Sequence, residues 1–153
     1  MGKEFGVGDK IPDFTLPNER NELVSISAKD AKNRIIYFYP KDDTKVCTAQ
    51  ACNFRDWQSE LTELGYEVIG ISSDSTAAHQ QFIAKYNLNF TLLSDKGGKV
   101  RKQFGASSFI GLIPSRKTFL VNKFGIVEFS YNSMFEDEGH IKAVKQFITD
   151  KNK

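Results

Sequence analysis

A largely apolar run at residues 34–39 constrains the fold more than any other feature of this chain. After Arg34, both faces of the run carry β-branched or aromatic side chains, and Pro40 stops it. A strand without a polar face is buried on both sides, as the inner strands of parallel and mixed sheets are. The chain is therefore predicted to place this strand inside a sheet that is covered on both faces.

Helical and strand patterns alternate after this strand. Phe54, Trp57 and Leu61 recur at helical spacing, and Gly65 is expected to end their helix. The next expected elements are a strand at 67–72, a helix around 82–86, a strand at 90–93 and a short helix around 100–104. This alternation is typical of an α/β protein.

The order of elements changes in the last third of the chain. Residues 117–121 and 126–131 are predicted to form a hairpin, and a final amphipathic helix follows around residues 141–148. Two short extended pieces around Phe14 and Val24 precede the first buried strand. We therefore expect one domain over residues 1–153, with its core at about 5–149. Its predicted fold is thioredoxin-like: a central mixed β-sheet flanked by helices, with an N-terminal β extension.

Composition excludes several functional classes. The 21 Lys and Arg residues against 19 Asp and Glu give a formal charge of +2 without a basic face, so no nucleic-acid partner is expected. No apolar stretch approaches the ~20 residues that cross a bilayer. The polar start at Met1 lacks the apolar core of a signal peptide, which predicts a cytoplasmic protein. The alternative is an organelle such as the plastid, if a transit peptide has been removed.

The chain contains only two cysteines, Cys47 and Cys52. Two closely spaced thiols in a reducing compartment indicate redox chemistry or metal binding rather than a disulfide scaffold. Two ligands are too few for a structural zinc site, and His79 and His140 fall in separate helical patterns. No metal site is therefore expected.

Cys47 is expected at the start of the helix that follows the first buried strand. Free amide groups and the positive end of the helix dipole favour a thiolate there, and they can hold a negatively charged oxygen. Helical spacing also places Cys47 near the apolar side of the helix, where an inert buried thiol is the other interpretation. Position alone leaves both open. Asp42 and Asp43, just before the helix, are expected to be solvated loop charges.

Pro40, Thr44 and Cys47 form the pattern Pro-x-x-x-Thr-x-x-Cys, which resembles the active-site signature of peroxiredoxins. The run at 52–56 is similar to the Q-type, or bacterioferritin-comigratory, subfamily. Further similar runs lie at 68–72, 90–95 and 116–120, so that the resemblance covers roughly residues 5 to 148.

The resemblance implies a peroxidase that reduces hydrogen peroxide and organic hydroperoxides without a cofactor. Cys47 would be the peroxidatic cysteine and would become a sulfenic acid. Thr44 would offer its hydroxyl to the peroxide, and Pro40 would shield the pocket. Arg116 would approach Cys47 from elsewhere in the fold and stabilise negative charge.

Cys52 stands at the spacing of the resolving cysteine in many Q-type members. On an ideal helix, Cα atoms five residues apart are ~8.6 Å from each other, whereas disulfides rarely tolerate more than ~7 Å. A Cys47–Cys52 disulfide therefore requires the first turns of the helix to unwind. The resemblance implies that thioredoxin, or a similar dithiol, reduces this disulfide. The spacing of the two cysteines suggests a mechanism that is complete within one subunit, so a monomer is expected.

Other functions stay open. Cys52 could be a spectator in a peroxidase that uses one cysteine and an external thiol. The chain could instead be a redox-regulated binding protein with Cys47 as its peroxide sensor. A thioredoxin-type disulfide oxidoreductase would normally carry Cys-x-x-Cys, which this chain lacks.

The chain departs from the family pattern at two places. Lys45 and Val46 stand where the family usually has Pro-Gly, so we expect a changed pocket entrance with preserved chemistry. Gln50 stands where Glu is more frequent, so no role that needs a carboxylate is expected there.

Overall fold

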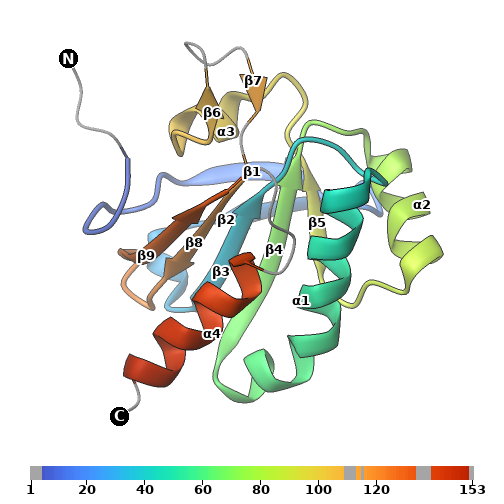
Figure 1. The fold of residues 1–153 in the computed structure, drawn as a ribbon. Coiled ribbons are helices and arrows are strands. Elements are labelled where there is room, and N and C mark those ends of the chain that lie inside the picture. The colour runs from blue at the N-terminus through green and yellow to red at the C-terminus, as the bar shows by residue number, and fades with distance from the viewer. Residues whose placement is uncertain (1–4, 109–112, 115, 134–138, 152–153) are drawn as a thin grey trace.

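The computed structural model describes residues 5–108, 113–114, 116–133 and 139–151, and it places helices and strands around one central sheet (Figure 1). In chain order the elements are β1 (Phe14–Pro17), β2 (Leu23–Ile26), the 3-10 helix η1 (Ala28–Asp30), β3 (Asn33–Phe38), α1 (Lys45–Glu63), β4 (Tyr66–Ser72), α2 (Thr76–Tyr86), β5 (Thr91–Ser94), α3 (Lys99–Gln103), β6 (Ser107–Ser108), β7 (Ile113–Pro114), β8 (Lys117–Val121), β9 (Val127–Asn132) and α4 (Gly139–Lys151). The predicted α/β alternation is confirmed.

The five-stranded sheet has the order β5-β4-β3-β8-β9. Strand β3 pairs in parallel with β4 and antiparallel with β8, so Ile36 lies between Ile69 and Phe119. The predicted central strand, the mixed sheet and the β8–β9 hairpin are therefore confirmed. Strand β3 ends at Phe38, one residue before the predicted end.

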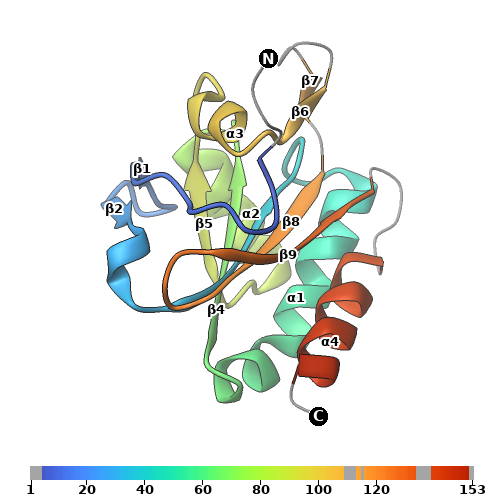
Figure 2. The same cartoon turned by 90° about the vertical axis from the view of Figure 1, so that its left-hand side faces the viewer.

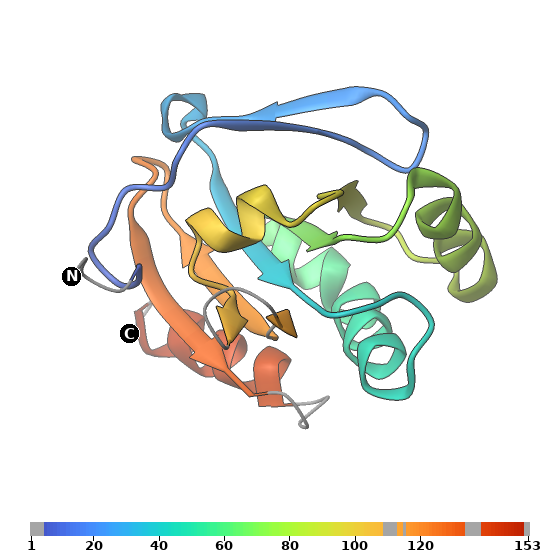
Figure 3. The same cartoon turned by 90° about the horizontal axis from the view of Figure 1, so that it is seen from above.

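Layers of different kinds cover the two faces of the sheet (Figure 3). Ile35 and Tyr37 of β3 belong to an apolar cluster that includes buried side chains of α1, α2 and α4. Ile36 and Phe38 belong to a second cluster, with side chains of β1, β2 and α3. The antiparallel β1–β2 pair is the N-terminal β extension that the sequence predicts. This double covering explains why β3 has no polar face.

Gly70 of β4 allows the ring of Tyr37 to lie across the neighbouring strand. A Cβ atom at Gly70 would lie 2.8 Å from a Leu92 methyl carbon and 2.9 Å from the Tyr37 ring. Tyr37 in turn stacks on Phe54 of α1 with ring centroids 4.7 Å apart. A side chain at Gly70 would therefore displace the ring that stacks on Phe54 of α1.

Helix α1 extends along the sheet beside α4 (Figure 2). It ends at the predicted place, because Gly65 follows with a φ of +89°, a conformation that favours glycine. Among the helices in the described part of the chain, none is long and apolar enough to span a membrane.

Candidate active site

Cys47 lies in the first turn of α1, at the end of the sheet where β3 stops. Thr44 is the N-cap residue with extended backbone angles, and its carbonyl accepts the first helical hydrogen bond from the Thr48 amide at 2.8 Å. Cys47 is the third helical residue, and the amides of this turn have no acceptor within the helix. They and the helix dipole favour negative charge at this position.

Cys47 is only 2% exposed and belongs to the apolar cluster that also contains Tyr37, Tyr39, Ala51 and Phe54. It therefore occupies the apolar side of α1, as its helical spacing predicts. Burial raises the pKa of the Tyr37 phenol well above its usual range, and the nearby Cys47 adds to that shift. The ring beside the sulfur is thus a neutral phenol.

Arg116 reaches the sulfur from the neighbouring strand. It immediately precedes β8, whose first residue, Lys117, lies opposite Phe38 at the end of β3. Its Nη2 donates to Cys47 Sγ at 3.1 Å, and the residue is only 3% exposed. A guanidinium keeps its charge when buried and stabilises negative charge on a sulfur or an adjacent oxygen.

Gln50 lies one turn after Cys47 and holds the other arm of the guanidinium. Its Oε1 accepts a hydrogen bond from Arg116 Nη1 at 2.5 Å, and the residue is fully buried. A neutral amide therefore orients Arg116 without neutralising its charge. The sequence shows an amide rather than a carboxylate at this position, but it does not reveal the role of the amide oxygen. Arginine only donates hydrogen bonds, so it needs an acceptor beside it. The position of Gln50, on the same side of the helix as Cys47, was the sequence signal for that acceptor.

Thr44 and Pro40 lie in the loop that joins β3 to α1. The Thr44 hydroxyl donates to the Lys41 carbonyl oxygen at 3.0 Å, and the residue is exposed. Pro40 is half-buried and follows Tyr39 directly. Both residues are thus on the chain segment that leads to Cys47, with the Thr44 hydroxyl at the surface.

Cys52 lies within the same uninterrupted helix, and both cysteines are free thiols. Cys52 is half-buried, whereas Cys47 is buried. The ideal-helix separation of ~8.6 Å between their Cα atoms therefore applies to this fold. A bond between them requires α1 to unwind between these two positions.

The expectation that Asp42 is a solvated charge is wrong. Asp42 is 8% exposed; its Oδ1 accepts from the Tyr39 hydroxyl at 2.5 Å, and its Oδ2 lies 2.6 Å from His79 Nδ1. Local sequence does not show this burial, because His79 comes from α2, 37 residues away. The available signal was His79 itself, which stands three residues before Phe82 on the buried side of α2.

Asp43 is an exposed charge, as expected, but it is not isolated. Its carboxylate accepts from Lys85 Nζ at 2.8 Å and from the Tyr86 hydroxyl at 2.6 Å. The hydrogen bond from Lys85, then that from Tyr86, lowers the pKa of the Asp43 carboxyl below its usual value. Both aspartates of the loop are therefore fastened to α2.

Asp42, Asp74 and His79 form a cluster in which each offers one potential metal-ligand atom, all within 4.8 Å of one another. Their polar atoms are engaged in hydrogen bonds: both ring nitrogens of His79 lie beside oxygen acceptors, and Asp74 accepts from Ser72 and from the Asp42 amide. We therefore treat the cluster as a hydrogen-bond network that supports the loop.

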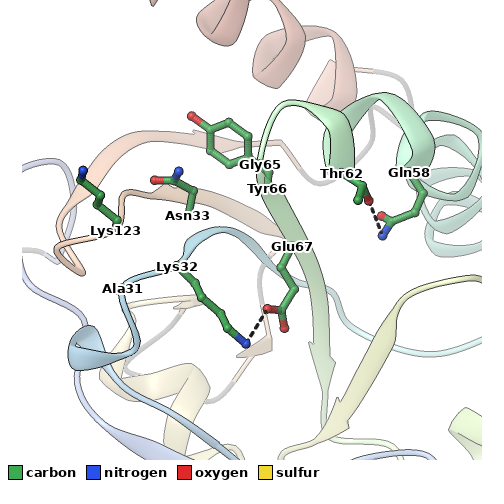
Figure 4. A pocket seen from close by; sticks show the side chains of 9 residues that line it. All are labelled: Ala31, Lys32, Asn33, Gln58, Thr62, Gly65, Tyr66, Glu67 and Lys123. Carbon is green, nitrogen blue, oxygen red and sulfur yellow. Dashed lines mark hydrogen bonds and ion pairs between the residues drawn. The ribbon is translucent and has the colours of Figure 1, made fainter.

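A separate surface pocket lies at the other end of the sheet (Figure 4). It is lined by Ala31, Lys32, Asn33, Gln58, Thr62, Gly65, Tyr66, Glu67 and Lys123. These residues surround the start of β3 and the end of α1, whereas Cys47 follows the end of β3 and lies at the start of α1. The pocket therefore does not belong to the site around Cys47.

Comparison with known proteins connects this site to a family. The AhpC/TSA family matches residues 7–130. The protein named peroxiredoxin Q, chloroplastic, of Triticum aestivum is 47% identical over 142 residues, and that of Arabidopsis thaliana is 44% identical over 142 residues. The match covers 92% of this chain in both cases, but 65% and 66% of the two relatives. The chain thus spans about two thirds of their length.

Solved structures give the same result for the fold. Peroxidoxin BcpB of Mycobacterium tuberculosis superimposes with a TM-score of 0.87 at 29% identity, over 96% of this chain and 98% of that one. Peroxiredoxin Q of Xanthomonas campestris superimposes with a TM-score of 0.83 at 27% identity, over 92% of each chain. The predicted thioredoxin-like arrangement agrees with these neighbours.

Proposed function

Because the chain belongs to the AhpC/TSA family, and within it to the Q-type peroxiredoxins, we propose that it is a thiol-dependent peroxidase with Cys47 as its reactive residue. The observation that carries the proposal is the 3.1 Å contact between Arg116 Nη2 and Cys47 Sγ in the first turn of α1. A buried sulfur with a fixed positive charge and free amides beside it is suited to react as a thiolate.

The first step transfers one oxygen from the peroxide to Cys47. The thiolate attacks the terminal oxygen of ROOH, the O–O bond breaks, and Cys47 becomes a sulfenic acid. The leaving alkoxide, or hydroxide for hydrogen peroxide, takes a proton from water. Arg116 and the amides of the first turn stabilise the charge on the departing oxygen. Thr44 offers its hydroxyl to the peroxide once it turns from the Lys41 carbonyl, and Pro40 borders the pocket.

The second step joins Cys47 to Cys52. The Cys52 thiol attacks the sulfenic sulfur, a disulfide forms, and water leaves. Because both residues start within α1, the helix unwinds between them before the sulfur atoms meet. Thr48, Ala49, Gln50 and Ala51 separate the two cysteines, and the two alanines carry no large side chain that must be removed from the core.

The third step needs an external dithiol, because the disulfide is reopened by thiol–disulfide exchange. We propose thioredoxin or a similar protein as this reductant, in line with the family. Resolution within one chain makes a monomer sufficient for the cycle.

The names of similar proteins support two finer parts of the proposal. A structural neighbour, the bacterioferritin comigratory protein of Xanthomonas campestris, is described as having alkyl peroxide reduction activity. This supports organic hydroperoxides as substrates alongside hydrogen peroxide. The chloroplastic names of the plant relatives support the plastid alternative for localisation.

Peroxide consumption with a thioredoxin system tests the whole cycle in wild type, Cys47→Ser and Cys52→Ser. Cys47→Ser is expected to abolish turnover. Cys52→Ser is expected to form the sulfenic acid at the normal rate but to lose thioredoxin-dependent turnover and the intramolecular disulfide. Full activity in Cys47→Ser contradicts the proposed function. Unchanged turnover in Cys52→Ser identifies a peroxidase in which Cys52 is a spectator.

Stoichiometry separates the enzyme from a peroxide sensor, because both begin with oxidation of Cys47. A sensor consumes about one peroxide per chain and stops, whereas a peroxidase continues while reductant lasts. We therefore expect peroxide consumption far beyond one equivalent. A stop at one equivalent, with reductant still present, would favour the redox-regulated binding protein.

A further inference from the structure

The loop at residues 40–44 carries Thr44 and Pro40 but contains no glycine. The side chain and amide of Asp42 connect this loop to three other parts of the fold. Oδ1 accepts from the hydroxyl of Tyr39, just after β3, and the amide donates to Asp74 Oδ2, after β4, at 2.8 Å. Oδ2 meets His79 Nδ1, on α2, at 2.6 Å. A buried carboxylate therefore anchors the centre of the loop.

The geometry requires a proton in the bond between Asp42 and His79. The Nε2 atom of His79 lies 3.0 Å from the carbonyl oxygen of Leu93, which can only accept, so Nε2 carries a hydrogen. Two bare acceptors would repel each other at 2.6 Å, so one hydrogen also lies between Nδ1 and Oδ2. The pair holds this hydrogen whether it resides on the ring or on the carboxyl group.

We propose that Asp42 and His79 are positioning residues, whose hydrogen bond fixes the 40–44 loop and thereby the position of Thr44 and Cys47. The inference rests on the proposed function, because it concerns the rate at which Cys47 reacts with peroxide. Thr44 follows Asp42 by two residues, and its carbonyl accepts the first hydrogen bond of α1. Displacement of Asp42 therefore moves the N-cap and the first turn of the helix.

Other titratable groups surround this pair. Burial raises the pKa of the Tyr39 phenol well above its usual range, and the Asp42 carboxyl is a further cause, so Tyr39 remains a hydrogen-bond donor. Asp74 faces the Asp42 amide. Asp43 and Lys85 form an ion pair nearby at the surface. Two kinds of substitution at Asp42 are therefore informative: one that removes the charge but keeps the hydrogen bonds, and one that removes the charge and the hydrogen bonds together.

Asp42→Asn preserves the complete hydrogen-bond set without the extra proton. The amide oxygen accepts from Tyr39, and the amide nitrogen donates to Nδ1 of a neutral His79, whose Nε2 still donates to Leu93. Asp42→Ala removes these side-chain contacts, and His79→Leu removes the partner. The three variants separate the geometry of the loop from the charge of the carboxyl group.

The test is a single-turnover measurement in a Cys52→Ser background, where the Cys47 sulfenic acid cannot form the disulfide. Hydrogen peroxide is added, and the sulfenic acid is trapped with a dimedone probe and quantified by mass spectrometry. Asp42→Asn is expected within about twofold of its parent, whereas Asp42→Ala and His79→Leu slow the reaction by about tenfold or more through misplacement of the reacting groups. Circular dichroism checks that each variant is folded.

Two outcomes overturn the proposal. One is a folded Asp42→Ala or His79→Leu variant that reacts at the parent rate. The other is a folded Asp42→Asn variant as slow as the other two, because the hydrogen-bond set would then not determine the rate. This second outcome stays decisive even if Asp42→Ala does not fold. A parent protein that forms no sulfenic acid at Cys47 refutes the proposed function itself, and the two failures are thus distinguishable.

Discussion

The segments before and after Cys47 are held in different ways. Before it, the loop at 40–44 is fastened by side chains: Asp42 bonds to Tyr39 and His79, and Asp43 to Lys85. After it, the segment at 48–52 is held by the backbone hydrogen bonds of α1 and by the burial of Gln50 and Ala51. The two segments match the two demands of the proposed cycle. Peroxide attack needs a fixed entrance to the sulfur, whereas resolution needs the helix behind the sulfur to open.

Arg116 connects Cys47 to the helical segment behind it, because its two arms contact Cys47 and Gln50. Removal of its charge should therefore have the largest effect. We expect Arg116→Met to slow sulfenic acid formation by about 10²–10³-fold, the usual cost of a lost donor to a developing negative charge. Arg116→Lys should recover only part of this loss, because Lys cannot hold two partners in the same planar geometry.

Stopped-flow measurement of peroxide reduction in a Cys52→Ser background tests the Arg116 variants without interference from disulfide formation. The thermal unfolding midpoint of each variant serves as the control for folding. A rate within twofold of the parent in a folded Arg116→Met would show that the helix N-terminus alone activates the sulfur.

Sequence patterns were sufficient for the part of the site that is encoded locally. The buried run at 34–39 and the helical spacing after it place Cys47 at the junction of β3 and α1, because both signals lie within one continuous stretch. The strand ends were displaced by only about one residue, which is ordinary for such boundaries.

Contacts between distant segments could not be worked out from local patterns. Arg116 meets Cys47 across 69 residues because β8 pairs with β3, and only the family resemblance indicated that approach. The burial of Asp42 depends in the same way on His79 from α2. A charged residue in a short loop is usually solvated, so its sequence alone predicts the wrong environment. The packing of distant segments, rather than the local sequence, brings Arg116 to Cys47 and His79 to Asp42.

Gln50 shows that the fixed loop at 40–44 and the unwinding segment at 48–52 do not have fully separate roles. It lies in the segment after Cys47, yet its amide oxygen holds Arg116 against the sulfur. Gln50→Glu would put a carboxylate next to the guanidinium and weaken its positive field at Cys47. We expect sulfenic acid formation to slow by about fivefold at neutral pH, an effect of the size that a partly screened charge produces. The same stopped-flow assay measures it, and an equal or faster rate would contradict the assigned role.

The stability of α1 between the two cysteines should determine how readily the segment at 48–52 unwinds. Ala49 lies between the cysteines and is half-buried. Glycine in a helix is less favourable than alanine by roughly 0.5–1 kcal/mol, so Ala49→Gly should favour the unwound state. We expect disulfide formation after oxidation to accelerate by about threefold, with little change in peroxide attack. Rapid quenching with a thiol-blocking reagent measures the rate of disulfide formation. If this rate is the same in Ala49→Gly and in wild type while disulfide formation limits the reaction, the predicted unwinding step is wrong.

The smallest expected effect is that of Asp43 in the loop at 40–44. Lys85 and Tyr86 lower the pKa of its carboxyl below the ordinary value of 3.8. A carboxyl whose pKa is lower in the folded state than in the unfolded state stabilises the fold above the unfolded value, and this contribution disappears as pH falls through the folded value. Asp43→Asn should therefore lower the urea midpoint slightly at neutral pH. The difference from wild type should persist down to about pH 4 and shrink below it.

Because the pair is exposed, added salt should reduce the difference as well. A difference that is independent of pH would contradict a role for the Asp43 charge, whereas one that changes with pH but not with salt would show that the hydrogen bond from Tyr86, rather than the charge of Lys85, holds this end of the loop to α2.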